Sequence, residues 1–319
     1  MEPTAKKRFQ RLLLRWFDAN KRDLPWRKDT DPYRVWLSEI MLQQTRVSAV
    51  LDHYRRFLER FPTVEHLARA REASVLAAWS GLGYYRRARM LHAAALEIVR
   101  NHEGKFPRSA AELRNLPGIG RYTAAAIASI AFGEAAAVVD GNVERVLQRL
   151  NGKPIVGEAL WQAAQDLIGS NRPGDHNQAL MELGATVCLP KAPKCRACPI
   201  LQLCATQGEG ERLQIPNRQR KRSVSYILDN RDGSILLTKR PQTERLMPGM
   251  WELPQGGEPD GVQPLFTVRH SITVTDYRVH VLPGPAAERA DSRWVQAGRL
   301  VKLPLTGLTR KILRTAKII

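Results

Sequence analysis

The chain has 319 residues, which at roughly 150 residues per domain predicts two domains. Lys and Arg number 50 against 31 Asp and Glu, which gives a net charge of +19 and a pI of about 10.3. Hydrophobic residues make up 43% of the chain, which excludes global disorder, and no run of 18 apolar residues predicts a membrane-spanning helix. This composition predicts a polyanionic partner.

The opening sequence MEPTAKKRFQRLLLRWF interrupts its apolar run with arginines and has no small-residue cleavage site. A secretory signal is therefore not expected. We expect a soluble, cytoplasmic protein of bacterial type that associates with the nucleoid and not with a membrane. Most of the basic excess lies in residues 1–222, which carry 36 basic and 22 acidic side chains.

Residues 1–207 are predicted to form an all-α domain. Several segments are rich in Ala, Leu and Arg and place their apolar residues at helical spacing. These segments are 74–79, 86–100, 122–132 and 143–150. Asp31 and Pro32 are typical of a helix start, because Asp caps free N–H groups and Pro suits the first turn.

A polar, basic segment, 208–222, is predicted to be a linker, which serves either as a phosphate contact or as an inert tether. After it the hydrophobic period becomes two, which predicts a small α+β domain over 223–319. The expected strands are 223–229, 234–240, 266–275 and 277–282, with a hairpin turn at 230–233 and a final helix at 309–319. The fold class is therefore mainly α, followed by a smaller α+β domain.

All four cysteines lie within 17 residues, in the pattern C-x6-C-x2-C-x5-C formed by Cys188, Cys195, Cys198 and Cys204. Thiols of an intracellular protein stay reduced, so the pattern favours a four-thiolate metal site over disulfides. The spacing alone leaves zinc and an iron–sulfur cluster equally open. Four protein ligands close either centre to substrate, which indicates a structural role.

The segment Leu116–Gly120, LPGIG, precedes a predicted helix. Gly118 and Gly120 allow a tight turn and a close approach, and the helix start offers free N–H groups to a phosphate. The alternative is an ordinary turn between two helices. The basic composition favours the phosphate site.

Two acidic residues are candidates for chemistry. Glu39 shares a helix face with Val35, Trp36 and Leu42, so partial desolvation is expected to raise its pKa toward that of a general acid. The alternative, a surface glutamate paired with Arg, is favoured by this stretch alone. Asp140 precedes a helix as an N-cap, where backbone N–H groups keep a carboxylate charged beside a developing cation.

Five motifs occur in order: WLSEIMLQQTRV (36–47), GLGYYRRA (81–88), LPGIGRYTA (116–124), VVDGNVERV (138–146) and the four cysteines. Together they resemble the MutY family of adenine DNA glycosylases, in the helix–hairpin–helix superfamily. The resemblance is dense from residue 24 to residue 204. It implies a base-excision enzyme that acts on double-stranded DNA and removes adenine mispaired with 8-oxoguanine or guanine, as a monomer with a [4Fe–4S] cluster.

The resemblance also implies residue roles. Glu39 matches the acid that protonates adenine, and Asp140 matches the carboxylate that stabilises the oxocarbenium-like sugar. Polar residues of the same site match Tyr122 and Asn142, and positions that face the extruded adenine match Arg27 and Gln178. Wedge residues that fill the gap in the DNA stack match Gln44 and Tyr84, with Leu42, Gln43 and Thr45 nearby; core packing is the alternative for Tyr84 and Leu42.

In the related endonuclease III family, a lysine two residues after the last hairpin glycine forms a Schiff base and cuts the strand. Tyr122 occupies that position here and cannot form an imine, so a monofunctional glycosylase is expected. The alternatives are a bifunctional glycosylase/lyase on the same scaffold and a non-catalytic iron–sulfur DNA-binding protein.

Residues 237–257 resemble the Nudix-like C-terminal domain of the family, but the sequence after Glu258 lacks the Glu-rich box that binds metal. This domain is therefore expected to recognise the lesion and not to hydrolyse a nucleotide. The Phe-Ser-His stretch with which the family reads 8-oxoguanine is best matched by Val268-Arg269-His270, which keeps only the histidine. Ser271 supplies a hydroxyl, although successive strand residues point to opposite faces.

Overall fold

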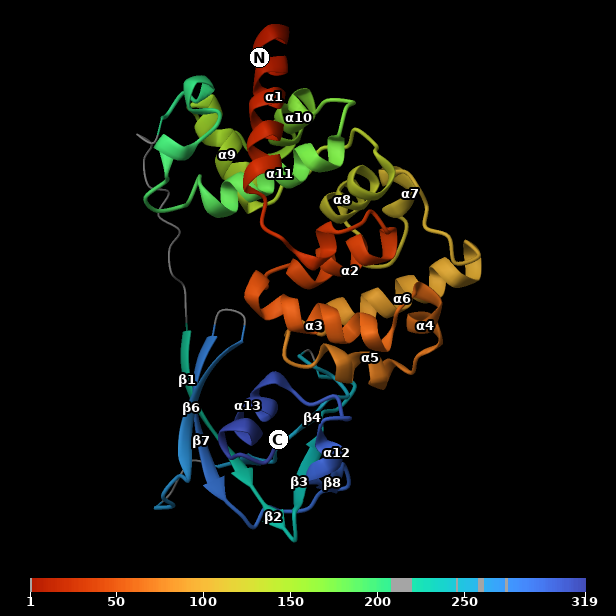
Figure 1. Cartoon of the computed structure of the whole chain (residues 1–319). Coiled ribbons are helices and arrows are strands. Elements are labelled where there is room, and N and C mark those ends of the chain that lie inside the picture. Colours follow the sequence, from red (N-terminus) through yellow and green to blue (C-terminus); the bar gives the residue numbers. More distant parts are fainter. Residues whose placement is uncertain (1, 208–219, 245, 258–260, 273–274) are drawn as a thin grey trace. The chain divides into compact units, whose positions relative to one another are not determined.

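The structure is a computed structural model that describes residues 2–207, 220–244, 246–257, 261–272 and 275–319 (Figure 1). The greater part of the predicted linker, residues 208–219, lies outside the described residues, as do residues 258–260, where the missing Nudix box was noted. The chain divides into two compact units. The first unit comprises residues 1–54, 63–68 and 93–214, and the second comprises residues 55–62, 69–92 and 215–319.

The first unit is helical, and the part of residues 1–207 that the structure describes contains no strand, which confirms the predicted all-α character. Its elements are α1 (Pro3–Asn20), the 3₁₀ turn η1 (Pro25–Arg27), α2 (Pro32–Leu42), α4 (Val64–Arg69), α7 (Ala110–Leu113), α8 (Arg121–Phe132), α9 (Gly141–Asn151), α10 (Gly157–Leu167), α11 (Pro173–Thr186), η2 (Cys195–Ala197) and η3 (Leu201–Leu203). Two further helices, α3 (Val47–Arg60) and α6 (Arg86–Asn101), are shared between the units.

The predicted helix starts have the expected local cause. The Asp31 side chain accepts a hydrogen bond from the Arg34 backbone N–H at 2.9 Å, and Pro32 occupies the first turn of α2. Buried side chains of α1, α8, α9, α10 and α11 form one core. Within it, α11 lies so close to α9 that a Cβ at Gly184 would come within 2.6 Å of the Asn142 Cβ. The core therefore fixes the start of α9 against α11.

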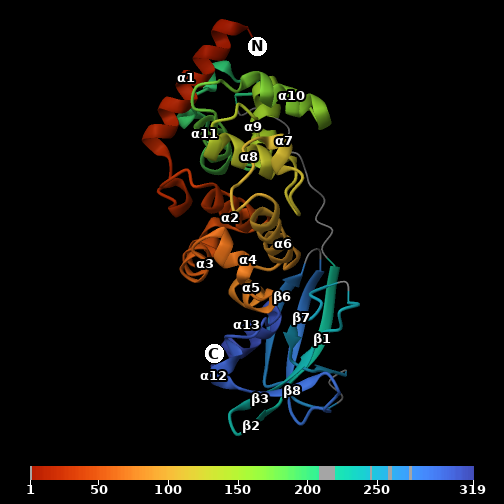
Figure 2. The ribbon, with the colours of Figure 1, turned by 90° about the vertical axis from the view of Figure 1, so that its right-hand side faces the viewer.

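The second unit contains two four-stranded sheets, which confirms the predicted α+β character. One sheet has the order β5-β1-β7-β6, and the other has the order β2-β3-β4 with β8 paired to β3. The strands are β1 (Arg220–Leu228), β2 (Asn230–Arg231), β3 (Ser234–Lys239), β4 (Trp251–Glu252), β5 (Gln255–Gly256), β6 (Phe266–Ile272), β7 (Thr275–Pro283) and β8 (Ser292–Gln296), and the helices are α12 (Ala297–Leu300) and α13 (Gly307–Thr315). Helix α13 packs beside β6 and β7 over a shared apolar core (Figures 1 and 2).

A helical segment of the chain also belongs to the second unit: residues 69–92, with α5 (Glu72–Trp79). The hydroxyls of Ser80 and Tyr85 donate to the Leu305 carbonyl at 2.8 and 3.0 Å, and Arg310 Nε donates to Ser80 Oγ at 2.8 Å. These hydrogen bonds join residues 69–92 to the α+β part of the chain. The predicted first domain, residues 1–207, includes this segment, so its bounds differ from those of the first unit.

Local boundaries differ slightly from the expected ones. Strand β1 begins at Arg220, so the last three residues of the predicted linker belong to the sheet. The hairpin turn narrows to Asp232 and Gly233, whose φ angles of 48° and 73° are those that Asp-Gly turns favour. Among the described residues, none of the helices has the length and apolarity needed to cross a bilayer.

Candidate active site

A cavity of about 520 Å³ opens in the first unit, and it collects side chains from elements far apart in the sequence. Its lining comes from η1, α2 and the turn after it, α8, the start of α9, and α11. The residues are Arg22, Leu24, Trp26, Arg27, Val35, Ser38, Glu39, Leu42, Gln43, Gln44, Thr45, Val47, Tyr122, Ile130, Asp140, Gly141, Asn142, Gln178, Met181, Glu182 and Ala185.

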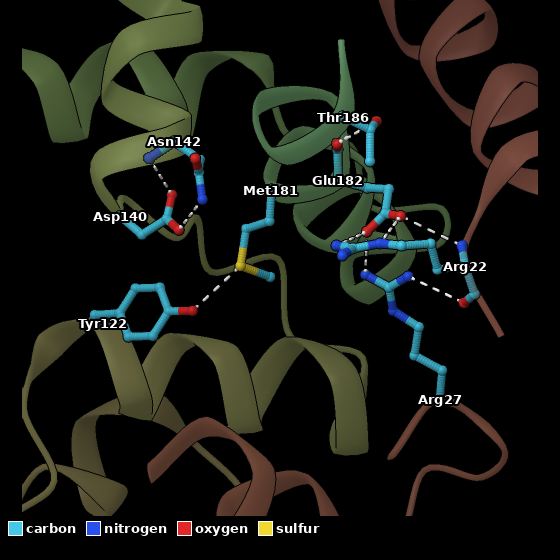
Figure 3. A network of polar contacts seen from close by, with 8 residues as sticks. All are labelled: Arg22, Arg27, Tyr122, Asp140, Asn142, Met181, Glu182 and Thr186. Carbon is cyan, nitrogen blue, oxygen red and sulfur yellow. Dashed lines mark hydrogen bonds and ion pairs between the residues drawn. The ribbon is translucent and has the colours of Figure 1, made fainter. Parts of the chain in front are cut away.

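Glu39 is the buried acid of this cavity, with only 6% of its surface exposed. The Tyr122 hydroxyl donates to Glu39 Oε2 at 2.7 Å, and the same hydroxyl oxygen lies 3.2 Å from the Met181 sulfur (the tyrosine and the sulfur appear in Figure 3). Burial raises the pKa of Glu39 to about 7. The Tyr122 hydrogen bond lowers the pKa, the charge of Asp140 raises it, and Arg27 lowers it. Glu39 therefore holds a proton near neutral pH.

Asp140 is the second carboxyl group of the cavity and caps α9. Its Oδ1 accepts hydrogen bonds from the backbone N–H groups of Asn142 and Val143 at 2.9 and 2.7 Å. Its Oδ2 accepts one from Asn142 Nδ2 at 3.1 Å (Figure 3 shows Asp140 and Asn142). Three donors thus bind the Asp140 oxygens at the start of α9, where the helix dipole is positive. The cavity therefore contains one carboxyl group in an apolar setting and one in a setting of donors.

A third carboxyl group of the cavity, Glu182, was not singled out in the sequence. It lies on α11 with 0% of its surface exposed and binds Arg22 and Arg27, which also line the cavity (Figure 3). The only sequence signal is a lone glutamate within the apolar run ALMELGATV. Periodicity cannot indicate that two guanidinium groups bind it, because Arg22 and Arg27 lie 160 and 155 positions away along the chain.

The structure brings most of the predicted site residues to this cavity. Besides Glu39 and Asp140, the lining includes Tyr122, Asn142, Arg27, Gln178, Leu42, Gln43, Gln44 and Thr45. The other predicted site residues lie elsewhere: Tyr84, Gly118, Gly120, His270, Ser271 and the four cysteines. Gln43 Nε2 donates to Thr123 Oγ1 at 3.2 Å, which ties the turn after α2 to α8. Gln44 is exposed and has a left-handed backbone with φ of 54°, a conformation that is rare outside glycine and is concentrated at functional sites.

Tyr84 belongs to the second unit and is not among the residues that line the cavity. It shares two features with Gln44: φ is 47°, and 46% of its surface is exposed. The Arg87 guanidinium lies 5.4 Å from the centre of its ring. Core packing, the alternative for Tyr84, does not agree with this exposure.

The hairpin segment 116–120 forms the turn between α7 and α8. Gly118 has a φ of 74°, a conformation that glycine adopts without strain. Gly120 is the N-cap of α8, and a Cβ added there would meet nothing within 4 Å. The backbone at the start of α8 is therefore open to the approach of another group.

The four cysteines lie on the segment after α11, around η2 and η3, and three of them pack on the helical core. Burial, followed by the charges of the other three cysteines, raises the pKa of the Cys198 thiol to about 11. Arg149 Nη1 donates to Cys188 Sγ at 3.3 Å. In the described ranges, no three His, Cys, Asp or Glu side chains converge as a metal group. The donor set itself, four soft thiols, fits a thiolate-bound centre of zinc or of iron and sulfur.

A second cavity, of about 550 Å³, lies on the sheet β5-β1-β7-β6 of the second unit, and most of its lining residues are polar or charged. It is lined by Lys221, Arg222, Ser223, Arg269, His270, Ser271, Asp276, Tyr277, Arg278 and His280. Arg269 of β6 is the direct cross-strand partner of Arg278 of β7, and both side chains are exposed. Cross-strand pairs of like charge are destabilising. This face therefore holds two like charges directly opposite each other, and Asp276 is the acidic residue of the same lining.

His270 and Ser271 lie on β6 and project to opposite faces, as the strand period predicts. The Ser271 hydroxyl donates to Asp276 Oδ1 at 2.5 Å, on the face of Arg269 and Arg278. His270 is half-buried beside α13, where burial and the charge of Lys311 lower its pKa. The two residues therefore point in different directions along β6, although both line the cavity.

Comparison with known proteins places this chain in a family. Residues 37–155 match the HhH-GPD superfamily base excision DNA repair protein family. An adenine DNA glycosylase of Buchnera aphidicola subsp. Acyrthosiphon pisum is 34% identical over 248 residues, which cover 74% of this chain and 71% of that protein. The chain belongs to the adenine DNA glycosylase family.

Other members of the adenine DNA glycosylase family extend well beyond the aligned region. The rat adenine DNA glycosylase is 48% identical over 226 residues, which cover 65% of this chain and only 44% of the rat protein. Among solved structures, a thermostable thymine-DNA glycosylase is 30% identical with a TM-score of 0.61, and the match covers 65% of this chain and 98% of that one.

Proposed function

We propose that this chain is an adenine DNA glycosylase of base excision repair, which hydrolyses the N-glycosidic bond of adenine opposite 8-oxoguanine or guanine. Family membership supports the reaction class. The observation that carries the proposal is the buried Glu39, with a pKa of about 7, in one cavity with Asp140. Two carboxyl groups with different environments are what an acid and an anionic stabiliser require.

The proposed chemistry follows from this difference. Glu39 donates its proton to a ring nitrogen of the extruded adenine, and the electron pair of the N-glycosidic bond moves onto the protonated base, which leaves as neutral adenine. The carboxylate of Asp140 stabilises the positive charge that develops on the sugar. Water adds to the sugar carbon and loses a proton. The Tyr122 hydroxyl holds Glu39 in place through the 2.7 Å hydrogen bond.

Adenine reaches this cavity only after leaving the DNA stack, at a cost of a few kcal/mol. We assign the filling of that gap to Gln44 and Tyr84, whose side chains are exposed and whose backbone is left-handed. Arg27 and Gln178 contact the extruded base, and Asn142 holds Asp140. The open backbone around Gly118 and Gly120 binds DNA phosphates, which positions the duplex without reading its sequence.

The cysteine segment is proposed to hold a [4Fe–4S] cluster through Cys188, Cys195, Cys198 and Cys204. When bound, the cluster supplies structural closure of the loop and no open site for substrate. Arg145 connects this segment to α9: its Nε donates to the Cys188 carbonyl at 2.8 Å, and its Nη2 donates to Asn142 Oδ1 at 2.8 Å. A colourless, zinc-loaded protein would contradict the cluster.

The enzyme is proposed to be monofunctional, because Tyr122 follows the hairpin where strand cleavage would need an amine. The second unit is proposed to recognise the base opposite adenine. His270 and Ser271 face different ways on β6, so the polar face with Arg269 and Arg278 is better suited to DNA backbone than to a joint base contact.

The deciding experiment uses the purified full chain under single-turnover conditions. Three duplexes are compared, with adenine opposite 8-oxoguanine, adenine opposite guanine, and thymine opposite guanine as the control for the related thymine-DNA glycosylase. Free base is measured directly, and strand cleavage is scored before and after alkali. Release of adenine with cleavage only after alkali supports the proposal.

Each other outcome selects a different function. Cleavage before alkali indicates a bifunctional glycosylase/lyase. Release of thymine and not adenine indicates a different base specificity in the same cavity. Binding without release of any base indicates a non-catalytic DNA-binding protein and refutes the proposal.

A further inference from the structure

The carboxylate of Glu182 accepts four hydrogen bonds, and none of its surface is exposed. Its Oε1 accepts hydrogen bonds from Arg22 Nε at 2.6 Å and from the Arg22 backbone N–H at 3.3 Å, and its Oε2 accepts from Arg22 Nη2 at 2.8 Å and from Arg27 Nη2 at 2.9 Å. Arg27 Nη1 also donates to the Arg22 carbonyl at 3.3 Å. One carboxylate thus fixes both ends of the segment 22–27 to α11.

The location of this cluster links it to the proposed reaction. Arg22, Arg27 and Glu182 line the cavity that contains Glu39. Only 12% of the Arg27 side chain is exposed, so this cation lies in a poorly solvated wall, where charge acts strongly. The groups that act on Glu39 from the surrounding elements are Tyr122, Asp140 and Arg27, and the cation favours loss of the Glu39 proton.

The charge of Glu182 opposes that effect. Burial by itself raises the pKa of Glu182, but the hydrogen bonds and charges of Arg22 and Arg27 bring it below its ordinary value, so the group is an anion at neutral pH. A buried anion beside Arg27 offsets its cationic charge and fixes its guanidinium by a charge-assisted hydrogen bond.

We infer that Glu182 is a positioning residue for the proposed reaction: it fixes Arg27 in the cavity wall and offsets its charge, so that Arg27 contacts the extruded base without ionising Glu39. The inference rests on the proposed function and adds to it a residue that itself donates no proton and contacts no DNA.

The test is the pH dependence of adenine release in Glu182→Gln, measured in single turnovers from pH 6 to pH 9. With the anion removed, Arg27 is uncompensated and Glu39 loses its proton at lower pH. The rate loss relative to wild type is therefore expected to be roughly three- to tenfold larger at pH 8 than at pH 6. An equal loss at every pH would show a merely structural role and overturn the inference.

Two further variants separate charge from shape. Glu182→Asp keeps the charge but shortens the side chain, so its rate loss is expected to be the same at every pH. The double variant Arg27→Gln/Glu182→Gln removes both charges and is expected to regain the wild-type pH dependence at a reduced rate. Failure of the double variant to regain it would contradict an action through Arg27.

The matched control is Asp18→Asn, which breaks another carboxylate–arginine pair of the first unit, with Arg172, outside the cavity. Its pH dependence should equal that of wild type. If Glu182→Gln does not fold, the variant Arg27→Gln tests the inference instead. Removal of the cation must shift the fall of the single-turnover rate with rising pH to higher pH, and an unshifted fall refutes the inference.

A readout without turnover keeps this inference separate from the proposed function. The infrared C=O band of the protonated Glu39 carboxyl group is assigned by its loss in Glu39→Gln. In Glu182→Gln this band must disappear at lower pH than in wild type. Wild-type protein that releases no adenine refutes the proposed function, while the band still tests the effect of Glu182.

Discussion

The two cavities have nearly the same volume, about 520 and 550 Å³, but opposite electrostatics. The cavity of the helical unit buries Glu39 and Glu182 and pairs its arginines with Glu182. The cavity on the sheet of the second unit exposes Arg269 opposite Arg278, and its lining holds four Lys and Arg residues against one acidic residue, Asp276. Burial with internal compensation tunes proton affinity, whereas exposed, uncompensated charge attracts an external anion.

The largest effect is expected where this comparison is sharpest, at Glu39. Glu39→Gln removes the proton donor but keeps the shape of the side chain, so single-turnover adenine release should fall about 10²- to 10⁴-fold while DNA affinity is retained. Glu103→Gln is the matched control, because the Glu103 side chain is 86% exposed and outside the cavity. A near-normal rate in Glu39→Gln would remove Glu39 from the mechanism.

Asp140→Asn separates the charge of Asp140 from its capping role. Asparagine is as good an N-cap as aspartate, so the melting temperature should change little. Adenine release should fall about 10²- to 10³-fold, because the anion that stabilises the sugar cation is lost. Asp31→Asn, the same change at the N-cap of α2, serves as the control. Retention of activity in Asp140→Asn would leave capping as the role of Asp140.

The pH dependence of the wild-type rate tests the burial of Glu39. The acid works only when protonated, and its pKa is raised to about 7, so the rate should fall about tenfold per pH unit above pH 7. Single-turnover rates from pH 5.5 to pH 9 measure this limb. A rate that stays constant up to pH 9 would mean that the acid is not Glu39.

Stability gives an independent measure of the same group. The pKa of Glu39 is higher in the folded chain, about 7, than the ordinary 4.5, so folding takes up a proton between these pH values. The protonated Glu39 contributes its full stability below pH 4.5, and this contribution is lost as the pH rises to about 7. At pH 8 the buried carboxylate should therefore destabilise the protein by up to about 3 kcal/mol. Glu39→Gln should raise the melting temperature at pH 8 but not at pH 4.5, and equal melting temperatures at pH 8 would argue against desolvation.

The smallest effect is expected on the sheet of the second unit. The double variant Arg269→Ala/Arg278→Ala should leave single-turnover chemistry unchanged and reduce the slope of log affinity against log salt by about 0.9 per lost phosphate contact, or about 2 in total. Fluorescence anisotropy with a mismatched duplex at 50–300 mM KCl measures the slope. Arg293→Ala/Arg299→Ala removes the same charge from exposed positions outside this cavity. Equal slopes in the two variants would show that Arg269 and Arg278 contribute no more to DNA binding than other exposed arginines.

The sequence by itself determined the features that depend on neighbours along the chain. Asp31 before Pro32 and Asp140 before Gly141 predict the starts of α2 and α9, because an N-cap needs only the next turn of backbone. The change of hydrophobic period near residue 220 separates a helical part from an α+β part, and the Asp232-Gly233 turn follows from local φ preferences. The cysteine spacing likewise needs no tertiary information.

Only the tertiary structure decided which side chains from separate elements contact each other. Glu39, Tyr122 and Asp140 come from three separate elements, and the proton affinity of Glu39 depends on burial that its own helix could not specify, since the same stretch also fits a surface glutamate. Glu182 acquired a candidate role only when α11 was placed against Arg22 and Arg27. Desolvation and charge pairing act through space, so residues far apart in the chain set them, and local sequence patterns do not record those distances.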